Sequence, residues 1–257
     1  MTIETAKKVA RNEEETYDVI VIGAGAAGVG VAITLMHAGI ENFLVVDRET
    51  VGASFAAWPA ETRFITPSFP SNSIGMLDLN SVAIGVSPAY SMRVEHPTGQ
   101  EYAEHLQSLA GYFELPLMED TDVKTIEKID GVFHLETSNG PLYANNVIWS
   151  AGEYQYPSLS GFEGAEHCRH TATVGSYSSL EGDDFLIIGG YESGIDAAYH
   201  LAKNDKNVRV FDIEGPWASE SSDPSVALST YSFERMRHEK FEQNVELHAN
   251  TTITHVS

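Results

Sequence analysis

Two glycine-rich motifs carry the chemistry that this sequence suggests, because each combines the residue types that bind a dinucleotide. The first is Gly23-Ala-Gly25-Ala-Ala-Gly28, and Asp47 lies 19 residues after its last glycine, at the end of an apolar run. Glycines let the backbone turn tightly and approach a pyrophosphate. The helix that follows directs free N–H groups at it, and an acid about 20 residues later binds the ribose hydroxyls. The motif therefore predicts a dinucleotide site.

The same pattern occurs a second time. Gly189-Gly-Tyr-Glu-Ser-Gly194 follows an apolar run, and Asp212 lies 18 residues after Gly194. Tyr191 occupies the position of the second glycine, where its side chain would crowd a pyrophosphate unless the loop shifts. Two alternatives stay open, namely a working second nucleotide site or a retained fold whose site is weak or lost.

The carboxylate of Asp212 predicts which nucleotide the second site takes. It repels a 2′-phosphate and so favours NADH over NADPH. Neither Arg209 within the strand nor Glu214 after it offers a clamp for that phosphate. Glu192 and Ser193 are expected either to cap the start of the helix or to contact a ribose.

The candidate cofactor-binding residues follow from the two motifs. In the first site they are Gly23, Gly25, Ala26, Ala27, Gly28, Asp47 and Arg48, and in the second they are Gly189, Gly190, Tyr191, Glu192, Ser193, Gly194 and Asp212. Two nucleotides bound by one chain suggest electron transfer between them.

Segments outside the motifs add further candidates. Ser150-Ala151-Gly152 follows a short apolar run, and its small residues would let backbone lie against a flat cofactor. Phe55 and Trp58 are expected either to flank an aromatic ring system or to belong to the core. The cluster His167-Cys168-Arg-His170 lacks the spacing of a tetrahedral ligand set, so no metal site is predicted.

Composition limits the class of protein. The chain has 257 residues, of which 42% are hydrophobic, so it is long enough for two packed domains. Its formal net charge of −22 repels phosphate backbones and anionic lipid, which argues against nucleic acid or a membrane as a partner. So acidic a chain fits either a salt-rich cytosol or an ordinary acidic protein.

A cytoplasmic location is expected. Cys168 is the only cysteine, so the chain forms no internal disulfide and a reducing compartment fits. The first 16 residues lack the apolar core of a signal peptide. The apolar stretch 19–40 is interrupted by glycines and is typical of a strand, a turn and a helix rather than a membrane span.

Apolar periodicity predicts the elements around these sites. We expect βαβ units at 17–47 and 184–212, a helix at 101–113, a hairpin of 123–129 and 132–137, a strand at 147–150 and a final strand pair at 245–248 and 252–256. Residues 51–97 lack a clear period, and a loop of that length inside a globular chain is usually functional.

The order of a first glycine motif, Ser-Ala-Gly, a proline-containing crossover and a second glycine motif resembles the two-dinucleotide flavoproteins. Within these, residues 17–257 are similar to flavin-containing monooxygenases and related FAD/NAD(P)-dependent oxidoreductases. The resemblance implies an α/β fold with two Rossmann-like domains. A polar leader would occupy residues 1–16. It would be followed by a FAD-binding domain at 17–158, whose C-terminal part is missing, and by an NAD(P)-binding domain at 159–257.

The resemblance also implies cofactors and their surroundings. FAD would occupy the first site and NAD(P)H, with NADH preferred, the second. Ser54, Phe55 and Trp58 would approach the flavin, with Ala151 and Gly152 behind it. The implied function is hydride transfer from NAD(P)H to FAD and on to an unknown small-molecule substrate or electron acceptor. A homodimer is left open.

Departures from the family pattern define the alternatives. The monooxygenase signature Phe-x-Gly-x-x-x-His is matched at Phe162 and Gly164, but Cys168 stands at the histidine position, which puts oxygenation in doubt. A thioredoxin-reductase-like enzyme would need a partner protein's dithiol, because one cysteine cannot form a disulfide pair. The chain ends at Ser257, before the family's return to the flavin domain, so a fragment, a piece supplied from elsewhere or a loosely held flavin is expected. A non-catalytic nucleotide-binding protein is the remaining hypothesis.

Overall fold

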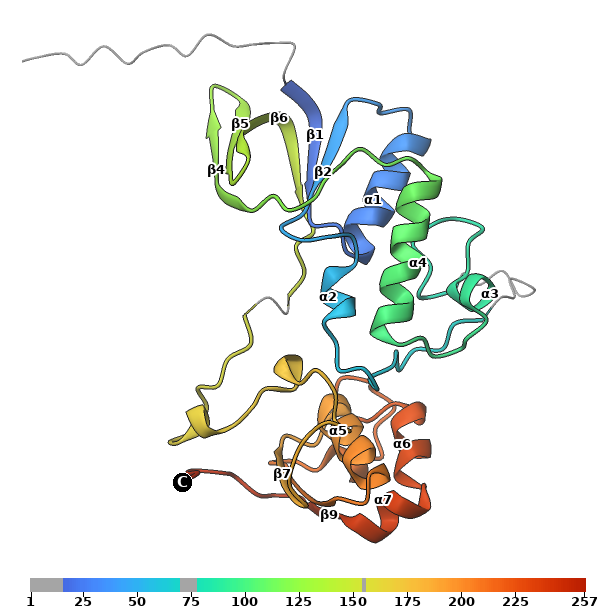
Figure 1. The fold of residues 1–257 in the computed structure, drawn as a ribbon, viewed down its shortest axis with the longest axis vertical. Coiled ribbons are helices and arrows are strands. Elements are labelled where there is room, and N and C mark those ends of the chain that lie inside the picture. The colour runs from blue at the N-terminus through green and yellow to red at the C-terminus, as the bar shows by residue number, and fades with distance from the viewer. Residues whose placement is uncertain (1–15, 70–77, 154–155) are drawn as a thin grey trace, which may run out of the picture. The chain divides into compact units, whose positions relative to one another are not determined.

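The computed structural model describes residues 16–69, 78–153 and 156–257. Contacts divide the chain into two compact units, one formed by Met1–Val51 and Leu106–Glu153 and the other by Gly52–His105 and Tyr154–Ser257. Each unit contains one sheet (Figure 1). The expected α/β fold with two nucleotide-binding sheets is therefore confirmed, whereas the domain limits at 17–158 and 159–257 stay predictions.

The first unit is built on a six-stranded sheet. Its strand order is β3-β2-β1-β6-β5-β4, with β1, β2, β3 and β6 parallel and the β4-β5-β6 part antiparallel. The strands are β1 (Thr16–Ile22), β2 (Phe43–Val46), β3 (Leu117–Met118), β4 (Val123–Ile129), β5 (Val132–Thr137) and β6 (Gly140–Trp149). Helix α1 (Ala26–His37) connects β1 to β2, and α4 (Gly99–Tyr112) runs from the second unit into the first.

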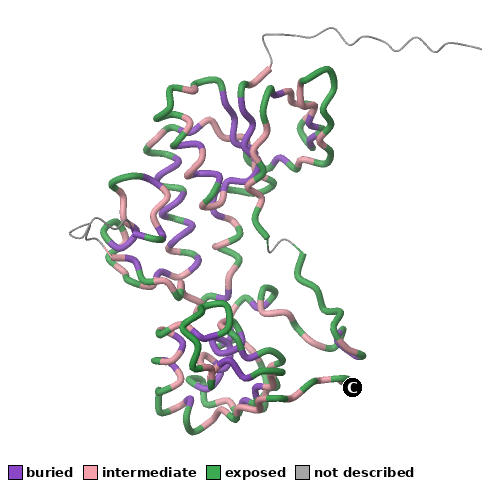
Figure 2. Tube along the Cα trace, turned by 180° about the vertical axis from the view of Figure 1, so that it is seen from behind, coloured by how far each residue is buried: buried purple, intermediate pink, exposed green. Residues whose placement is uncertain are grey.

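Local sequence explains these elements. Phe43–Val46 is buried along its whole length, as expected for a strand in the parallel part of a sheet (Figure 2). Gly39, after the end of α1, has a φ of +75°, which glycine adopts without strain. Asp130 and Gly131 both have positive φ, +50° and +89°, which suits the tight turn of the hairpin that the sequence predicts between β4 and β5.

The second unit has a three-stranded parallel sheet in the order β7-β8-β9. The strands are β7 (Asp184–Ile188), β8 (Asn207–Phe211) and β9 (Val245–His248), and the helices that lie wholly in the unit are α2 (Ala53–Ala56), α3 (Pro88–Met92), α5 (Glu192–Lys203), α6 (Thr230–Met236) and α7 (Glu239–Asn244). The buried face of α5, which includes Ile195 and Leu201, packs with Val208 and Val210 of β8 into one apolar core.

One expectation about the C-terminal part is wrong. The segment 252–256 forms no strand pair with 245–248. Instead β9 pairs with β8, and His255 makes an isolated bridge to Glu163. The polar segment after Asp212 contains α6 and α7, which its sequence did not predict. Their helical state depends on packing against α5, a contact between residues distant in sequence.

A buried charge pair holds the long segment 52–105 within the second unit. Asp196 on α5 forms an ion pair with Arg235 on α6, and both side chains are more than 90% buried. The hydroxyl of Thr62 donates a 2.6 Å hydrogen bond to the other carboxylate oxygen of Asp196. The loop that the sequence left without regular structure is therefore anchored by a satisfied buried carboxylate.

Glu61 provides a second anchor for the same segment. Its carboxylate accepts hydrogen bonds from the hydroxyl of Ser176 at 2.6 Å and from the N–H groups of Tyr177 and Ser178 at 3.0 and 2.9 Å. Burial alone would raise the pKa of Glu61, but these hydrogen bonds outweigh it and lower the pKa to about 2. The charged form therefore stabilises the folded state above the ordinary pKa of 4.5, and this stabilisation is lost as the pH falls toward 2.

We expect Glu61→Gln to lower the free energy of unfolding at pH 7 by about 2 kcal/mol, because charge-assisted hydrogen bonds are weakened. The difference from the wild type should shrink as the pH falls from 4.5 toward 2. Urea denaturation at a series of pH values measures it, with exposed Glu220→Gln as the control. A difference that does not depend on pH would contradict the role of the charge.

Candidate dinucleotide sites

Close packing explains two of the three glycines in the first motif. Gly23 follows β1 with a φ of +104°, and a Cβ on it would lie 2.4 Å from the carbonyl oxygen of Ser150. A Cβ on Gly28 would lie 1.7 Å from the carbonyl oxygen of Gly23. A Cβ on Gly25 would meet nothing within 4 Å. The space in front of Gly25 is therefore open, as the approach of a pyrophosphate requires.

The start of α1 is suited to an anion. Gly25 occupies the N-cap position without a side chain that could cap the first turn, and that turn contains no acidic residue. Ala26 is partly buried and Ala27 is exposed. The free N–H groups and the positive end of the helix dipole can therefore serve a phosphate.

Asp47 closes this turn from the end of β2. One carboxylate oxygen accepts a 2.6 Å hydrogen bond from the N–H of Ala24, and the other accepts a 2.8 Å bond from the N–H of Glu49. A carboxylate has about four acceptor positions, so two remain for ribose hydroxyls. Arg48 is exposed and lies 3.9 Å from the carboxylate of Glu49. Open space, an uncapped helix and a half-used carboxylate together fit a dinucleotide.

The second motif repeats the backbone of the first. Gly189 has a φ of +94°, and a Cβ on Gly194 would lie 1.9 Å from the carbonyl oxygen of Gly189. The φ and ψ of Tyr191 are −79° and −166°, against −77° and −166° for Gly25. Tyrosine at this position therefore costs no backbone strain. The difference between the two turns lies in the space that the side chain fills.

Side chains of the second turn reach the segment after β8. The hydroxyl of Tyr191 donates to the carbonyl oxygens of Pro224 and Ala227. The carboxylate of Glu192 accepts hydrogen bonds from the N–H and hydroxyl of Ser229 and from the hydroxyl of Ser232, at the start of α6. Glu192 therefore binds Ser229, the N-cap residue of α6, and the hydroxyl of Ser232 in the first turn of that helix.

The partners of Glu192 belong to α6 and its N-cap rather than to the start of α5, and contact of Glu192 with a ribose stays a prediction. Ser193 lies exposed in the first turn of α5. A carboxylate at the start of α5 also distinguishes this turn electrostatically from the first, which has none.

Asp212 holds the second turn as Asp47 holds the first. One of its oxygens accepts a 2.8 Å bond from the N–H of Gly190, and the other accepts from the N–H groups of Glu214 and Gly215 at 2.8 and 2.7 Å. Burial would raise the pKa of Asp212, but these three backbone donors outweigh it and lower the pKa. The carboxylate is therefore charged at neutral pH, and about one acceptor position remains for a ribose hydroxyl.

The structure brings together some of the other candidates. The Cα of Ala151 would lie 2.9 Å from a Cβ on Gly23, so this small-residue segment lies directly behind the first turn. Gly152 is exposed, with a φ of +79°. Sequence analysis did not single out the hydroxyl of Ser150, which is buried without a hydrogen-bond partner among the described residues. Its place in the small-residue run Ser150-Ala151-Gly152 was the available signal.

The aromatic candidates pack with one another in the second unit. Phe55 lies 5.4 Å from Trp58 and 4.9 Å from Tyr102, measured between ring centroids, and Phe64 completes the cluster. This packing is what the core alternative expected, and contact of these rings with a flavin stays a prediction. Ser54 is exposed on α2.

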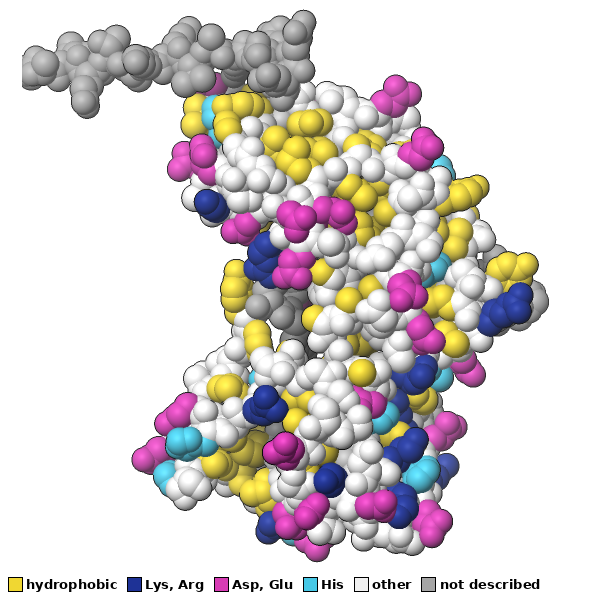
Figure 3. Space-filling view, viewed as in Figure 1, with side chains coloured by type: hydrophobic (Ala, Val, Ile, Leu, Met, Phe, Trp, Pro, Cys, Tyr) yellow, Lys and Arg dark blue, Asp and Glu magenta, His cyan; other side chains and the backbone are white. Residues whose placement is uncertain are grey.

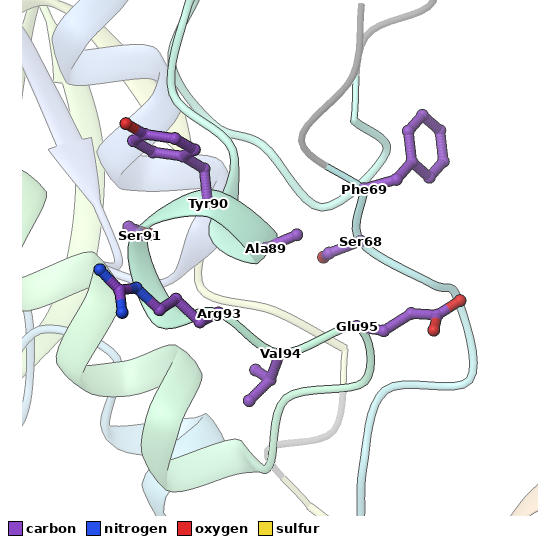
Figure 4. A pocket seen from close by; sticks show the side chains of 8 residues that line it. All are labelled: Ser68, Phe69, Ala89, Tyr90, Ser91, Arg93, Val94 and Glu95. Carbon is purple, nitrogen blue, oxygen red and sulfur yellow. The ribbon is translucent and has the colours of Figure 1, made fainter.

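An open pocket lies apart from these residues, around α3 in the second unit (Figure 4). Its volume is about 740 Å³, and the side chains of Arg93 and Glu95 at its edge point away from each other. It contains none of the candidate cofactor-binding residues.

Charge and metal ligands complete the description of the surface. Asp and Glu side chains are spread over the visible face of both units, in places side by side (Figure 3). In the described part of the chain, no group of three His, Cys, Asp or Glu side chains is arranged to hold a metal ion. Among the described helices, none combines the length and apolarity that a bilayer crossing needs.

Curated relatives share this sequence pattern. An uncharacterized CzcO-like oxidoreductase of Geobacillus kaustophilus is 28% identical over 195 residues, which cover 74% of this chain and 53% of that protein. The FAD-dependent urate hydroxylase of Xanthomonas campestris is 27% identical over 220 residues, with coverages of 76% and 45%. The chain thus spans about half the length of the curated relatives it matches.

Solved structures share the fold. The bacillithiol disulfide reductase Bdr of Staphylococcus aureus superposes with a TM-score of 0.75 at 20% identity, covering 95% of this chain and 69% of that one. A flavin-containing monooxygenase of Stenotrophomonas maltophilia gives a TM-score of 0.62 at 17% identity, covering 86% and 67%. The family model described as pyridine nucleotide-disulphide oxidoreductase matches residues 20–257. The chain therefore belongs to the pyridine nucleotide-disulphide oxidoreductase family.

Proposed function

We propose that this protein is a flavin-dependent oxidoreductase that moves a hydride from NAD(P)H to FAD and passes the electrons to an unidentified acceptor. FAD and NAD(P) are typical of the family. One observation carries the proposal: two glycine turns have the same backbone geometry, and each is closed by an aspartate on the neighbouring strand. Such a pair of turns suits two dinucleotides.

The differences between the turns support FAD in the first and the nicotinamide nucleotide in the second. The first has open space at Gly25, no acid at the start of its helix and two free acceptor positions on Asp47. The second has a tyrosine ring and the carboxylate of Glu192 at the helix start. Tighter anion binding at the first turn suits a resident cofactor, and weaker binding at the second suits a nucleotide that enters and leaves.

The chain's own residues bind and orient in this proposal. When bound, FAD supplies the hydride-accepting and electron-transferring chemistry. The start of α1 holds the pyrophosphate, Asp47 fixes the ribose and the Ala151 segment supports the turn. Asp212 fixes the second ribose. No general acid or base is assigned, because positioning carries this class of reaction.

A disulfide reductase is the alternative with a specific observation in its favour. The family name and the Staphylococcus aureus reductase both refer to disulfide chemistry. Since Cys168 is the only cysteine, the dithiol would belong to a partner. A monooxygenase is supported by the urate hydroxylase relative, and a non-catalytic nucleotide-binding protein by Tyr191.

A flavin spectrum of the purified full chain tests the proposal. We expect a yellow protein, or one that becomes yellow with added FAD. Its visible flavin absorbance should be bleached by NADH in the absence of oxygen. A yellow protein that NADH does not bleach favours the non-catalytic alternative. A colourless protein that cannot be reconstituted would overturn the flavin assignment. NADH-driven reduction of an added disulfide would favour the disulfide reductase.

Gly25 separates loss of flavin binding from loss of fold. In Gly25→Val the branched side chain enters open space, so we expect the fold to survive and flavin retention to fall at least tenfold (roughly 1.4 kcal/mol or more). Gly28→Ala should lower the melting temperature instead, because its Cβ would collide with the carbonyl of Gly23. Flavin absorbance per protein after desalting, together with the melting temperature, measures both effects.

Gly111→Val is the matched control for Gly25→Val. A Cβ on Gly111 also meets nothing within 4 Å, and the residue lies in the same unit. Full flavin retention in Gly25→Val would show that the pyrophosphate binds elsewhere.

Asp212 should set the preference for NADH over NADPH. Removing its charge relieves repulsion of a 2′-phosphate, so Asp212→Ser and Asp212→Asn should each narrow the ratio of the two dissociation constants by about tenfold. Asparagine keeps an acceptor for the N–H of Gly190 and so controls for loosening of the turn. Titration of each nucleotide into the FAD-loaded protein measures the ratio. An unchanged ratio in both variants would contradict the assignment.

A further inference from the structure

The indole of Trp217 lies directly on the second glycine turn. Trp217 is in a 3₁₀ helix, Pro216–Ala218, that follows Asp212. A Cβ on Gly190 would lie 2.2 Å from Cζ3 of the indole and 3.0 Å from Cε3. The ring therefore occupies the place that a side chain at position 190 would need. This contact explains a glycine at 190, which the dinucleotide motif does not require.

The indole and the carboxylate of Asp212 border the same small surface. A Cβ on Gly190 would lie 3.2 Å from the Cβ of Asp212, and the N–H of Gly190 donates to the carboxylate of Asp212. Cε2 of the indole lies 3.5 Å from a Cβ position on Gly215, whose N–H also donates to Asp212. A ribose held by the remaining acceptor position of Asp212 would thus lie next to the indole.

Packing fixes the ring in place. Trp217 packs against the apolar core of the second unit that includes Val208, Val210 and Leu228, and it remains only partly buried. A ring held in this way loses little conformational freedom when a flat ligand stacks on it. Trp217 lies five residues after Asp212. The residue five places after Asp47 is Gly52, so the first motif has no such ring in its sequence.

We propose that Trp217 forms the surface on which the adenosine half of the second nucleotide lies. The inference rests on the proposed function, because it needs a nucleotide at the second turn. Two residues would then recognise the adenosine: Asp212 holds the ribose through a single acceptor position, and the indole contacts the base. The aromatic surface compensates for a carboxylate that has fewer free positions than Asp47.

Binding of ADP-ribose to the full chain saturated with FAD tests this inference. ADP-ribose carries the adenosine half without the nicotinamide, and FAD fills the first site beforehand. We expect Trp217→Leu to weaken binding by about tenfold, the size of a lost base stacking contact (~1.4 kcal/mol), and Trp217→Phe to weaken it less. Isothermal titration calorimetry measures the dissociation constants. Exposed Tyr112→Leu in α4 is the control and should bind as the wild type does.

Fluorescence gives a second readout that does not require the leucine variant to fold. ADP-ribose should quench the tryptophan emission of the wild type, and this quenching should disappear in Trp217→Phe, which retains the other two tryptophans. The role of Trp217 would be overturned, and the proposed function left standing, by either of two results. One is ADP-ribose binding by folded Trp217→Leu that equals or exceeds that of the wild type, and the other is undiminished quenching in Trp217→Phe. If the wild type binds no ADP-ribose at all, the second nucleotide site fails and this inference fails with it.

Discussion

The hydrogen bond that the N–H of each glycine turn donates to a strand-end carboxylate is the constraint on which both candidate sites depend. Asp47 accepts from Ala24 at 2.6 Å, and Asp212 accepts from Gly190 at 2.8 Å. Each bond joins the end of one parallel strand to the turn after its neighbour. It fixes the helix start and places the charged oxygens beside it. A ribose and a pyrophosphate of one nucleotide can then be recognised from adjacent points.

Because the backbone is fixed in this way, the two turns share one conformation and differ in the groups around it. Tyr191 has the dihedral angles of Gly25. A tyrosine in place of glycine therefore fills the space in front of the turn without altering the backbone conformation. The segment after β8 then supplies contacts to three successive residues of the second turn, through Trp217, Pro224 and Ser229. This segment thereby contacts residues 190–192 of the second turn, whereas a Cβ on Gly25 in the first turn would meet nothing within 4 Å, which is a physical basis for unequal affinity.

Sequence patterns predicted the parts of the fold that short-range chemistry determines. The two βαβ units, the helix that became α4 and the hairpin at Asp130-Gly131 each follow from local periodicity and turn residues. Contacts between distant residues escaped prediction. α6 exists because α5 and α7 pack against it, and Glu192 bonds to Ser229, 37 residues away. The motif predicted the backbone of the second glycine turn, but could not show where the side chains of Tyr191 and Glu192 point.

The long segment without periodicity illustrates the same limit. Its sequence indicates a loop, and a loop is usually assigned to the domain that surrounds it in the chain. Contacts place residues 52–105 with Tyr154–Ser257, because Glu61 binds the N–H groups of Tyr177 and Ser178 and Thr62 satisfies the buried carboxylate of Asp196. A buried carboxylate left short of a donor is costly, so these bonds are strong constraints on the segment. Polar anchors, which leave no apolar period in a sequence, thus determine where Phe55 and Trp58 are held.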